Sequence, residues 1–232
     1  MPSSLNNRAL GEYLGFTVFA IALKAALDPI SWRYAAPISL IIVLISLSLY
    51  LKHQNRDLTR LGIVAFVRAK SYWLLPLQTV IAIVVVISTG VAVTLLGDLS
   101  GLLDMQSHSG GDEARFGNLT GNSSLFLLWL AIIWVAGPAE ELFFRGFMIN
   151  TLGELLGTSR IASALSVVIP ALVFGAVHMY YQGLPGLFTT GFIGISLGCL
   201  FLAYKRNIWP LMIAHACVNS LGFTLQYLGI DA

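Results

Sequence analysis

The feature that most constrains this chain is a series of long apolar stretches that carry almost no charge. The stretch from Trp73 to Leu96 contains no Asp, Glu, Lys or Arg, and a helix needs about 20 mostly apolar residues to cross a bilayer. In lipid, stretches of this kind satisfy their backbone hydrogen bonds by forming helices. They lack the alternation over about ten residues that marks a membrane β-strand. We therefore expect an all-α protein embedded in a membrane.

About seven segments of this kind follow one another along the chain, with six to eight as the expected range. The expected spans are residues 13–27, 35–51, 73–96, 125–156, 161–177, 183–204 and 208–230. Composition agrees, because charged residues make up only 10% of the chain, against about 25% in soluble domains. We expect one polytopic helix bundle, with the first helices and an outer loop in residues 1–120 and the functional region in residues 121–232.

The charges between the apolar stretches predict the orientation of the chain. Residues 52–72 carry one acid, Asp57, and the basic side chains Lys52, Arg56, Arg60, Arg68 and Lys70. Residues 97–123 carry one basic side chain, Arg115, and the acids Asp98, Asp104, Asp112 and Glu113. Lys and Arg gather in cytoplasmic loops, so we expect the first loop to lie inside and the second outside. The N-terminus is then inside and the C-terminus outside.

Three short polar motifs interrupt the later apolar segments. In chain order they are Glu140-Glu141-x-x-x-Arg145, Phe174-x-x-x-His178 and His215-x-x-x-Asn219. On insertion scales, a charged Asp, Lys or Arg at the centre of a membrane helix costs about 2.5–3.5 kcal/mol, and intramembrane ionisable groups usually serve a function. Together the motifs hold the ingredients of one hydrolytic site.

Helix geometry separates the two neighbouring carboxylates of the first motif. Glu141 and Arg145 are four residues apart and share a helix face, so they can pair. Glu140 is rotated by about 100° from Glu141. One carboxylate is thus neutralised while the other faces a cavity, where it can act as a general base. The same spacing in the second motif places Phe174 as an aromatic wall beside His178.

Each motif also has a structural interpretation. His178 or His215 alone can be a hydrogen-bonded packing residue, and a Glu–Arg pair near a helix end often reaches toward the interface. Asn219 can join helices. Buried Glu and His also occur along proton paths, so a proton-coupled transporter is one alternative and a catalytically silent membrane scaffold is another. No internal repeat of the kind found in many transporters is visible, which favours the hydrolase.

In this order and within apolar segments, the three motifs resemble the CAAX-protease and bacteriocin-processing family. That family includes the type II CAAX prenyl endopeptidases and the bacterial Abi-type proteins. The resemblance covers roughly residues 125–222, whereas residues 1–120 match no family pattern. It implies an intramembrane endopeptidase, which hydrolyses a peptide bond inside or at the membrane.

The resemblance also implies a role for each motif residue. Glu140 would deprotonate a water molecule, and His178 would orient that water or share its proton. His215 and Asn219 would donate hydrogen bonds to the developing oxyanion. Glu141 would belong to the same catalytic set and support its geometry, and Arg145 and Phe174 would support the site around it.

A zinc-dependent alternative stays open, because an older view of the family makes it a metallopeptidase. Glu140, His178 and His215 are a ligand set that can hold zinc with an open position for water. The chain has no His-Glu-x-x-His helix of the common zinc peptidases. We favour water activated by the glutamate, with no obligatory metal.

Composition and resemblance together indicate which kinds of partner to expect. We expect contact with membrane lipid and a membrane-associated peptide or protein substrate, in the inner membrane of a bacterium. In such a host a bacteriocin leader or a membrane-protein segment is a more plausible substrate than a prenylated C-terminus. No stripe of Lys and Arg with interleaved aromatic residues is present, so no nucleic-acid partner is expected.

The depths of the motif residues raise a difficulty for a shared site. At 1.5 Å per residue, His178 lies about 27 Å along its helix from Arg160, whereas His215 lies only about 12 Å from Asn207. A bend at Pro138 or Pro170, a loosened segment at residues 183–186, or helices that extend into the cytoplasm would reconcile these depths.

Overall fold

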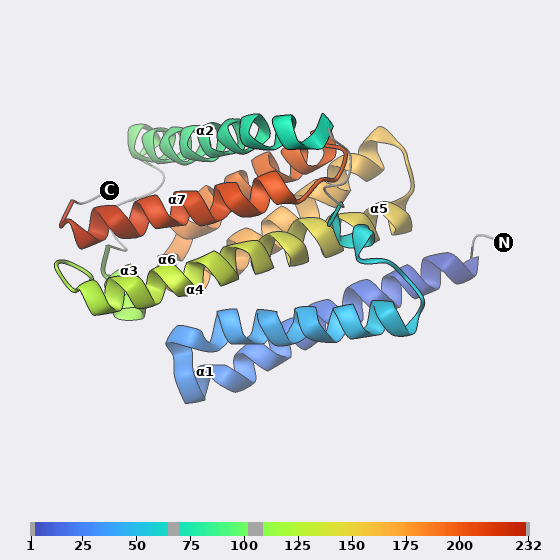
Figure 1. Cartoon of the computed structure of the whole chain (residues 1–232), viewed down its shortest axis with the longest axis horizontal. Coiled ribbons are helices and arrows are strands. Elements are labelled where there is room, and N and C mark those ends of the chain that lie inside the picture. Colours follow the sequence, from blue (N-terminus) through green and yellow to red (C-terminus); the bar gives the residue numbers. More distant parts are fainter. Residues whose placement is uncertain (1–2, 65–69, 102–108, 231–232) are drawn as a thin grey trace.

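The computed structural model describes residues 3–64, 70–101 and 109–230, and within these ranges it is 88% helix and has no strand (Figure 1). The elements are α1 (Ser3–His53), the 3₁₀ turn η1 (Leu58–Leu61), α2 (Lys70–Ser100), α3 (Ser109–Phe116), α4 (Ser123–Glu141), the π-helix η2 (Leu142–Ile149), α5 (Asn150–Leu156), α6 (Arg160–Ala203) and α7 (Trp209–Tyr227). The expected all-α fold is confirmed.

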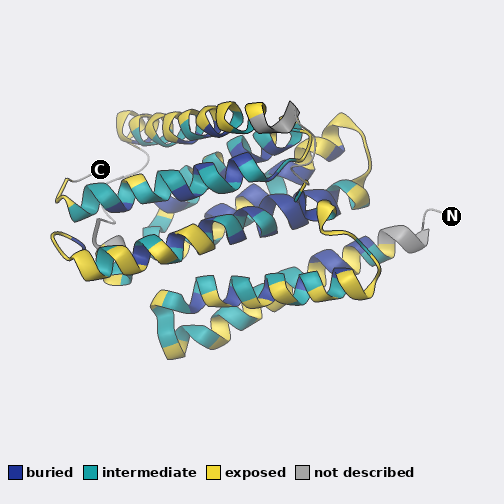
Figure 2. Ribbon diagram, in the orientation of Figure 1, coloured by how far each residue is buried: buried dark blue, intermediate teal, exposed yellow. Residues whose placement is uncertain are grey.

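Four helices within the described residues are long and apolar enough to cross a membrane. They are Asn7–His53, Trp73–Ser100, Ser123–Leu156 and Arg160–Ala203. Figure 2 shows that the outer face of α2 is mostly exposed, and its exposed side chains are large and apolar, with Trp73 87% and Leu99 84% exposed. Such a surface suits lipid. The count of about seven spans is not confirmed, and it stays a prediction.

The long helix α1 is a hairpin of two helical segments. Ser31 leaves the helical conformation at φ −159°, ψ 78°, and Figure 1 shows that α1 folds back on itself. The hydroxyl of Tyr50 donates a hydrogen bond of 3.0 Å to the carboxylate of Glu12, and Arg56 lies 3.0 Å from the same carboxylate. These contacts hold the two segments side by side and antiparallel.

The long helix α6 is a second hairpin, and glycines let its two segments approach closely. Gly183 breaks the helix at φ 64°, ψ −156°, a conformation that side chains with a Cβ rarely adopt. A Cβ added at Gly175 would overlap the carbonyl oxygen of Leu187, and one added at Gly194 would lie 3.1 Å from the Cα of Ala171. The residues before the break therefore pack directly against the residues after it, and His178 sits close to the turn.

Replacing Gly175 by alanine should push the two segments of this hairpin apart and destabilise the protein. The added methyl group meets the backbone of the opposite segment, with the Cα of Gly191 only 3.1 Å away, and overpacking of this kind costs about 1–3 kcal/mol. We expect lower thermal stability in detergent. The matched control is Gly90→Ala in α2, where the nearest atom to the new Cβ lies 3.9 Å away. Equal melting temperatures for the two variants would contradict the close packing of the α6 hairpin.

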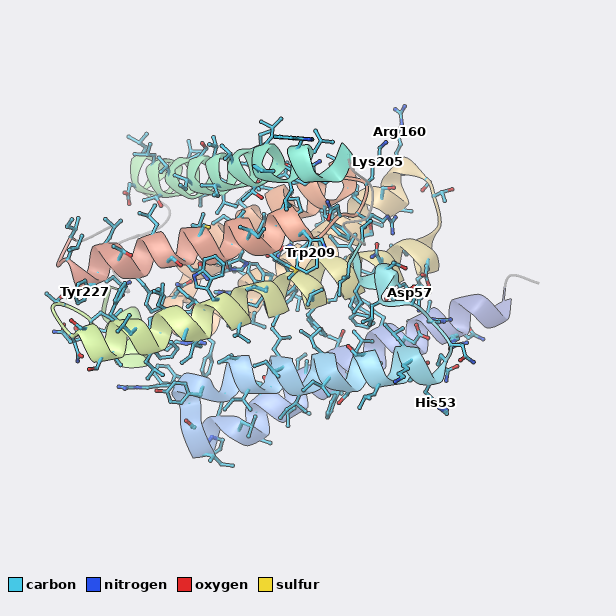
Figure 3. All side chains as sticks on the ribbon, in the orientation of Figure 1. His53, Asp57, Arg160, Lys205, Trp209 and Tyr227 are labelled. Atoms are coloured by element: carbon cyan, nitrogen blue, oxygen red, sulfur yellow. The ribbon has the colours of Figure 1, made fainter. Side chains whose placement is uncertain are left out.

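The loops that join the helices lie at two opposite ends of the molecule. Figure 3 places His53, Asp57, Arg160 and Lys205 at one end, with Tyr227 at the other. This arrangement agrees with the alternation that the loop charges require. Arg68 and Asp104, which also entered the orientation argument, lie outside the described residues, as do the side chains of Lys70 and Asp112.

Candidate active site

Glu141 is the buried partner of an ion pair at the junction of α4 and η2. Its side chain is fully buried, and its Oε1 atom lies 2.9 Å from Nη1 of Arg145, which is 2% exposed. The guanidinium of Arg145 also lies 4.7 Å from the centre of the Phe174 ring. The pairing expected from the four-residue spacing is confirmed, and it compensates two charges that would otherwise be buried alone.

The same carboxylate holds His215 of α7 in place. The Nδ1 atom of His215 lies 2.7 Å from Oε1 of Glu141, while its Nε2 atom lies 3.7 Å from Oε2 of Glu140. The imidazole packs closely on α4, since a Cβ placed at Gly137 would lie 3.4 Å from it, in ordinary contact. Since a carboxylate only accepts, Nδ1 of His215 donates the hydrogen bond, and Nε2 faces the second glutamate.

Glu140 faces a cavity, as the rotation between the two glutamates predicts. Its side chain is 25% exposed, in contrast to that of Glu141, and it lines two cavities together with His178. The two neighbouring carboxylates therefore have different environments. Glu141 is a structural counter-ion for Arg145, whereas Glu140 is free to meet a ligand.

His178 is oriented by its own helix. Its Nδ1 atom lies 2.8 Å from the carbonyl oxygen of Phe174, and the two rings lie edge to face with centroids 4.5 Å apart. A carbonyl oxygen only accepts, so Nδ1 carries the hydrogen and Nε2 of the neutral ring keeps its lone pair. The aromatic wall expected from the second motif is confirmed, and Phe174 also lies 6.3 Å from the ring of His215.

All the motif residues except the Glu141–Arg145 pair line one cavity of about 510 Å³. The motif residues that line it are Glu140, Phe174, His178, His215 and Asn219. This volume is within the range of small-molecule and cofactor sites, about 300–1,000 Å³. Three separate stretches of sequence therefore meet at one hollow between α4, α6 and α7.

His178 and His215 line the same cavity, although their distances along their own helices from the preceding loops differ. The unit from Ser123 to Leu156 has 34 residues, or about 51 Å of helix, which exceeds a hydrocarbon core of about 30 Å. Measured back from its end at Leu156, Glu140 lies at about 24 Å, close to the 27 Å of His178 along the next helix. Glu140 and His178 therefore lie at similar distances from the loop that joins their two helices. The extension of these helices into the cytoplasm stays a prediction.

Three features of the site were missed from sequence. The π-helix η2 directly follows Glu141 and contains Arg145; such segments are frequent at functional sites, but the apolar pattern carries no mark of it. Arg115 was interpreted only as a loop charge, although it lines the cavity. Tyr181, which also lines it, was not predicted as a site residue. Arg115 was the one basic residue of an acidic loop, and that signal was available.

The residues proposed for zinc do not form a metal-binding group in this arrangement. Among the described residues, no three or more His, Cys, Asp and Glu side chains lie close enough together to hold a metal ion. The Nδ1 atoms of His178 and His215 are engaged by a carbonyl and a carboxylate, respectively.

The fold and the site define a helical membrane protein in which one carboxylate and two imidazoles line a single cavity. Residues 122–221 match the family described as Type II CAAX prenyl endopeptidase Rce1-like. The matched segment contains all three motifs, so the resemblance inferred from them is confirmed. No curated protein and no solved structure matches the chain. The family match supports a protease role in a membrane.

Proposed function

We propose that the protein is an intramembrane endopeptidase that hydrolyses a peptide bond of a membrane-associated peptide or protein. The observation that carries the proposal is the single cavity that contains Glu140, His178, His215 and Asn219. A base, a second proton acceptor and two amide or imidazole donors are the groups that hydrolysis by an activated water needs.

In the proposed mechanism Glu140 takes a proton from a water molecule that also contacts Nε2 of His178. The water oxygen attacks the carbonyl carbon of the peptide bond and a C–O bond forms. The carbonyl oxygen becomes an oxyanion. The tetrahedral intermediate then collapses, the C–N bond breaks, and the proton held by Glu140 passes to the leaving nitrogen. His178, whose Nδ1 donates to the Phe174 carbonyl, is oriented to accept from water at Nε2.

The oxyanion would be stabilised by donors on α7. Asn219 stands one helical turn after His215, and both line the cavity, so their side chains can reach one oxygen atom. The amide of Asn219 donates in any state. Donation from His215 at Nε2 requires hydrogens on both ring nitrogens, because Nδ1 already donates to Glu141. Removal of one oxyanion donor typically lowers kcat by about 10²–10³.

We further propose that the chain crosses the membrane about seven times, with its N-terminus in the cytoplasm. The two segments of α1, the two segments of α6, and α2, α4 and α7 would be the crossings. The basic end, where Figure 3 shows His53, Arg160 and Lys205, would face the cytoplasm. A bacterial inner membrane is the expected location. Residues 121–232 would be the catalytic region, and residues 1–120 would complete the bundle.

A chelator tests the assignment of water activation to Glu140 rather than to zinc. The detergent-purified protein is incubated with a mixed peptide library, with and without a strong chelator, and the products are identified by mass spectrometry. We expect cleavage that the chelator leaves unchanged. Cleavage that the chelator abolishes and zinc restores would make Glu140, His178 and His215 metal ligands, and would overturn the proposed mechanism while keeping the endopeptidase.

A further inference from the structure

Arg115 of α3 is a cation that borders both cavities containing Glu140 and His178. Its guanidinium carbon lies 4.1 Å from the centre of the Tyr181 ring and 5.4 Å from that of Phe116. The aromatic rings hold the guanidinium at the rim of the site. Arg115 precedes the matched segment 122–221, so the family resemblance assigns it no role.

Among the described residues, the guanidinium of Arg115 has few polar partners. Its Nε atom is buried and has no hydrogen-bond partner, and among the described side chains none forms an ion pair with it. Arginine stays charged in proteins, and at this half-buried position a carboxylate can pair with the guanidinium through its remaining donors. Lys24, the other cation bordering the smaller cavity, already lies 2.7 Å from Asp28. Arg115 is therefore the group prepared to receive an anion.

The distance between the guanidinium of Arg115 and the ring of His178 has an upper limit. The ring of Tyr181 lies 5.8 Å from the ring of His178 and 4.1 Å from the guanidinium carbon. Arg115 is thus no more than about 10 Å from His178, and an extended peptide advances about 3.3–3.6 Å per residue. An anion bound by Arg115 lies within about three residues of a peptide bond beside His178.

We propose that Arg115 determines specificity by binding a carboxylate of the peptide substrate within about three residues of the cleaved bond. This inference rests on the proposed function, because it places a peptide in the cavity. A C-terminal carboxylate and an Asp or Glu side chain present the same pair of oxygens, which a guanidinium binds through two parallel hydrogen bonds. Arg115 would hold and orient the substrate and take no part in the transfer of protons.

A variant that lacks the proposed base allows peptide binding to be measured without cleavage, and this measurement tests the inference. The protein carries Glu140→Gln, and its probes are fluorescently labelled apolar decapeptides. One ends in a carboxylate, one ends in an amide, and a third ends in an amide but carries Glu in place of Gln near its end. We expect one carboxylate-bearing peptide to bind about tenfold or more tightly than the amide peptide. Which of the two binds better identifies the source of the carboxylate.

A matched pair of further substitutions locates the effect. Arg115→Gln, added to the Glu140→Gln protein, should abolish the preference for a carboxylate. Arg33→Gln should leave it unchanged, because Arg33 is exposed, lies near Gly117 at the same end of the bundle, and borders neither cavity.

Equal binding of all three peptides, or a preference that survives Arg115→Gln, would overturn the inference. Cleavage of the same peptides by the protein with Glu140 intact tests the proposed function separately. A preference for carboxylates without any cleavage would contradict the endopeptidase and keep the anion site. Cleavage without any preference for carboxylates would contradict the anion site and keep the endopeptidase.

Discussion

Replacing Glu140 by glutamine should lower peptide cleavage by about 10²–10⁴-fold, the usual contribution of a positioned base. Glutamine keeps the size of the side chain and its position at the cavity, but its amide cannot take a proton from water. Because Glu140 is 25% exposed and its neighbour Glu141 carries the buried ion pair, the fold should be unaffected. The measurement is the rate of product formation, with the melting temperature taken on the same sample.

The control for this substitution is Glu113→Gln, which removes an exposed carboxylate on α3 that borders neither cavity. We expect cleavage close to that of the unsubstituted protein. If both variants cleave at the original rate, Glu140 is not the base. If both lose activity and stability together, the loss reflects folding, and the role of Glu140 would have to rest on other variants.

Replacing Glu141 by glutamine should destabilise the protein by about 3–5 kcal/mol, the cost of leaving one member of a buried ion pair alone. Arg145 is 2% exposed, and its strongest contact is the carboxylate at 2.9 Å. Glutamine still accepts a hydrogen bond from His215, so the change removes charge more than geometry. Unfolding in mixed micelles, followed as a function of denaturing detergent, measures the effect.

The double variant Glu141→Gln with Arg145→Met separates charge from packing. Methionine fills much of the space of the arginine stem and carries no charge, and replacement of both members of a buried pair is often close to neutral. We expect the double variant to recover most of the stability that the single variant loses. A double variant as unstable as the single variant would contradict the ion pair as the cause, and would point to the arginine stem and its contact with Phe174.

Much of the site could be predicted because its elements are local. The four-residue spacings of Glu141 with Arg145 and of Phe174 with His178 are properties of a single helix, and both contacts are present. The rotation that sends Glu140 to a cavity follows from the same geometry. The all-α fold followed from the length of the apolar stretches. Patterns within one turn of helix are thus readable from sequence.

Features that depend on contacts between helices could not be predicted. The hydrogen bond between Glu141 on α4 and His215 on α7 joins two helices, and the sequence of neither helix predicts it. The turn at Ser31 lies in the gap between the expected spans 13–27 and 35–51, whereas the apolar sequence after Glu141 gives no sign of the π-helix. Arg115 was counted as a loop charge, because its approach to the cavity depends on Tyr181, a residue of another helix.

The most direct test of the account is hydrolysis by the purified protein in water enriched in ¹⁸O. Reconstituted protein is incubated with the peptide library, and the products are analysed by mass spectrometry. The account predicts new C-termini that carry one ¹⁸O atom, formed by the unsubstituted protein and not by Glu140→Gln. No cleavage by either protein, together with a proton flux across the liposomes that requires Glu140, would contradict it and make the cavity a proton path.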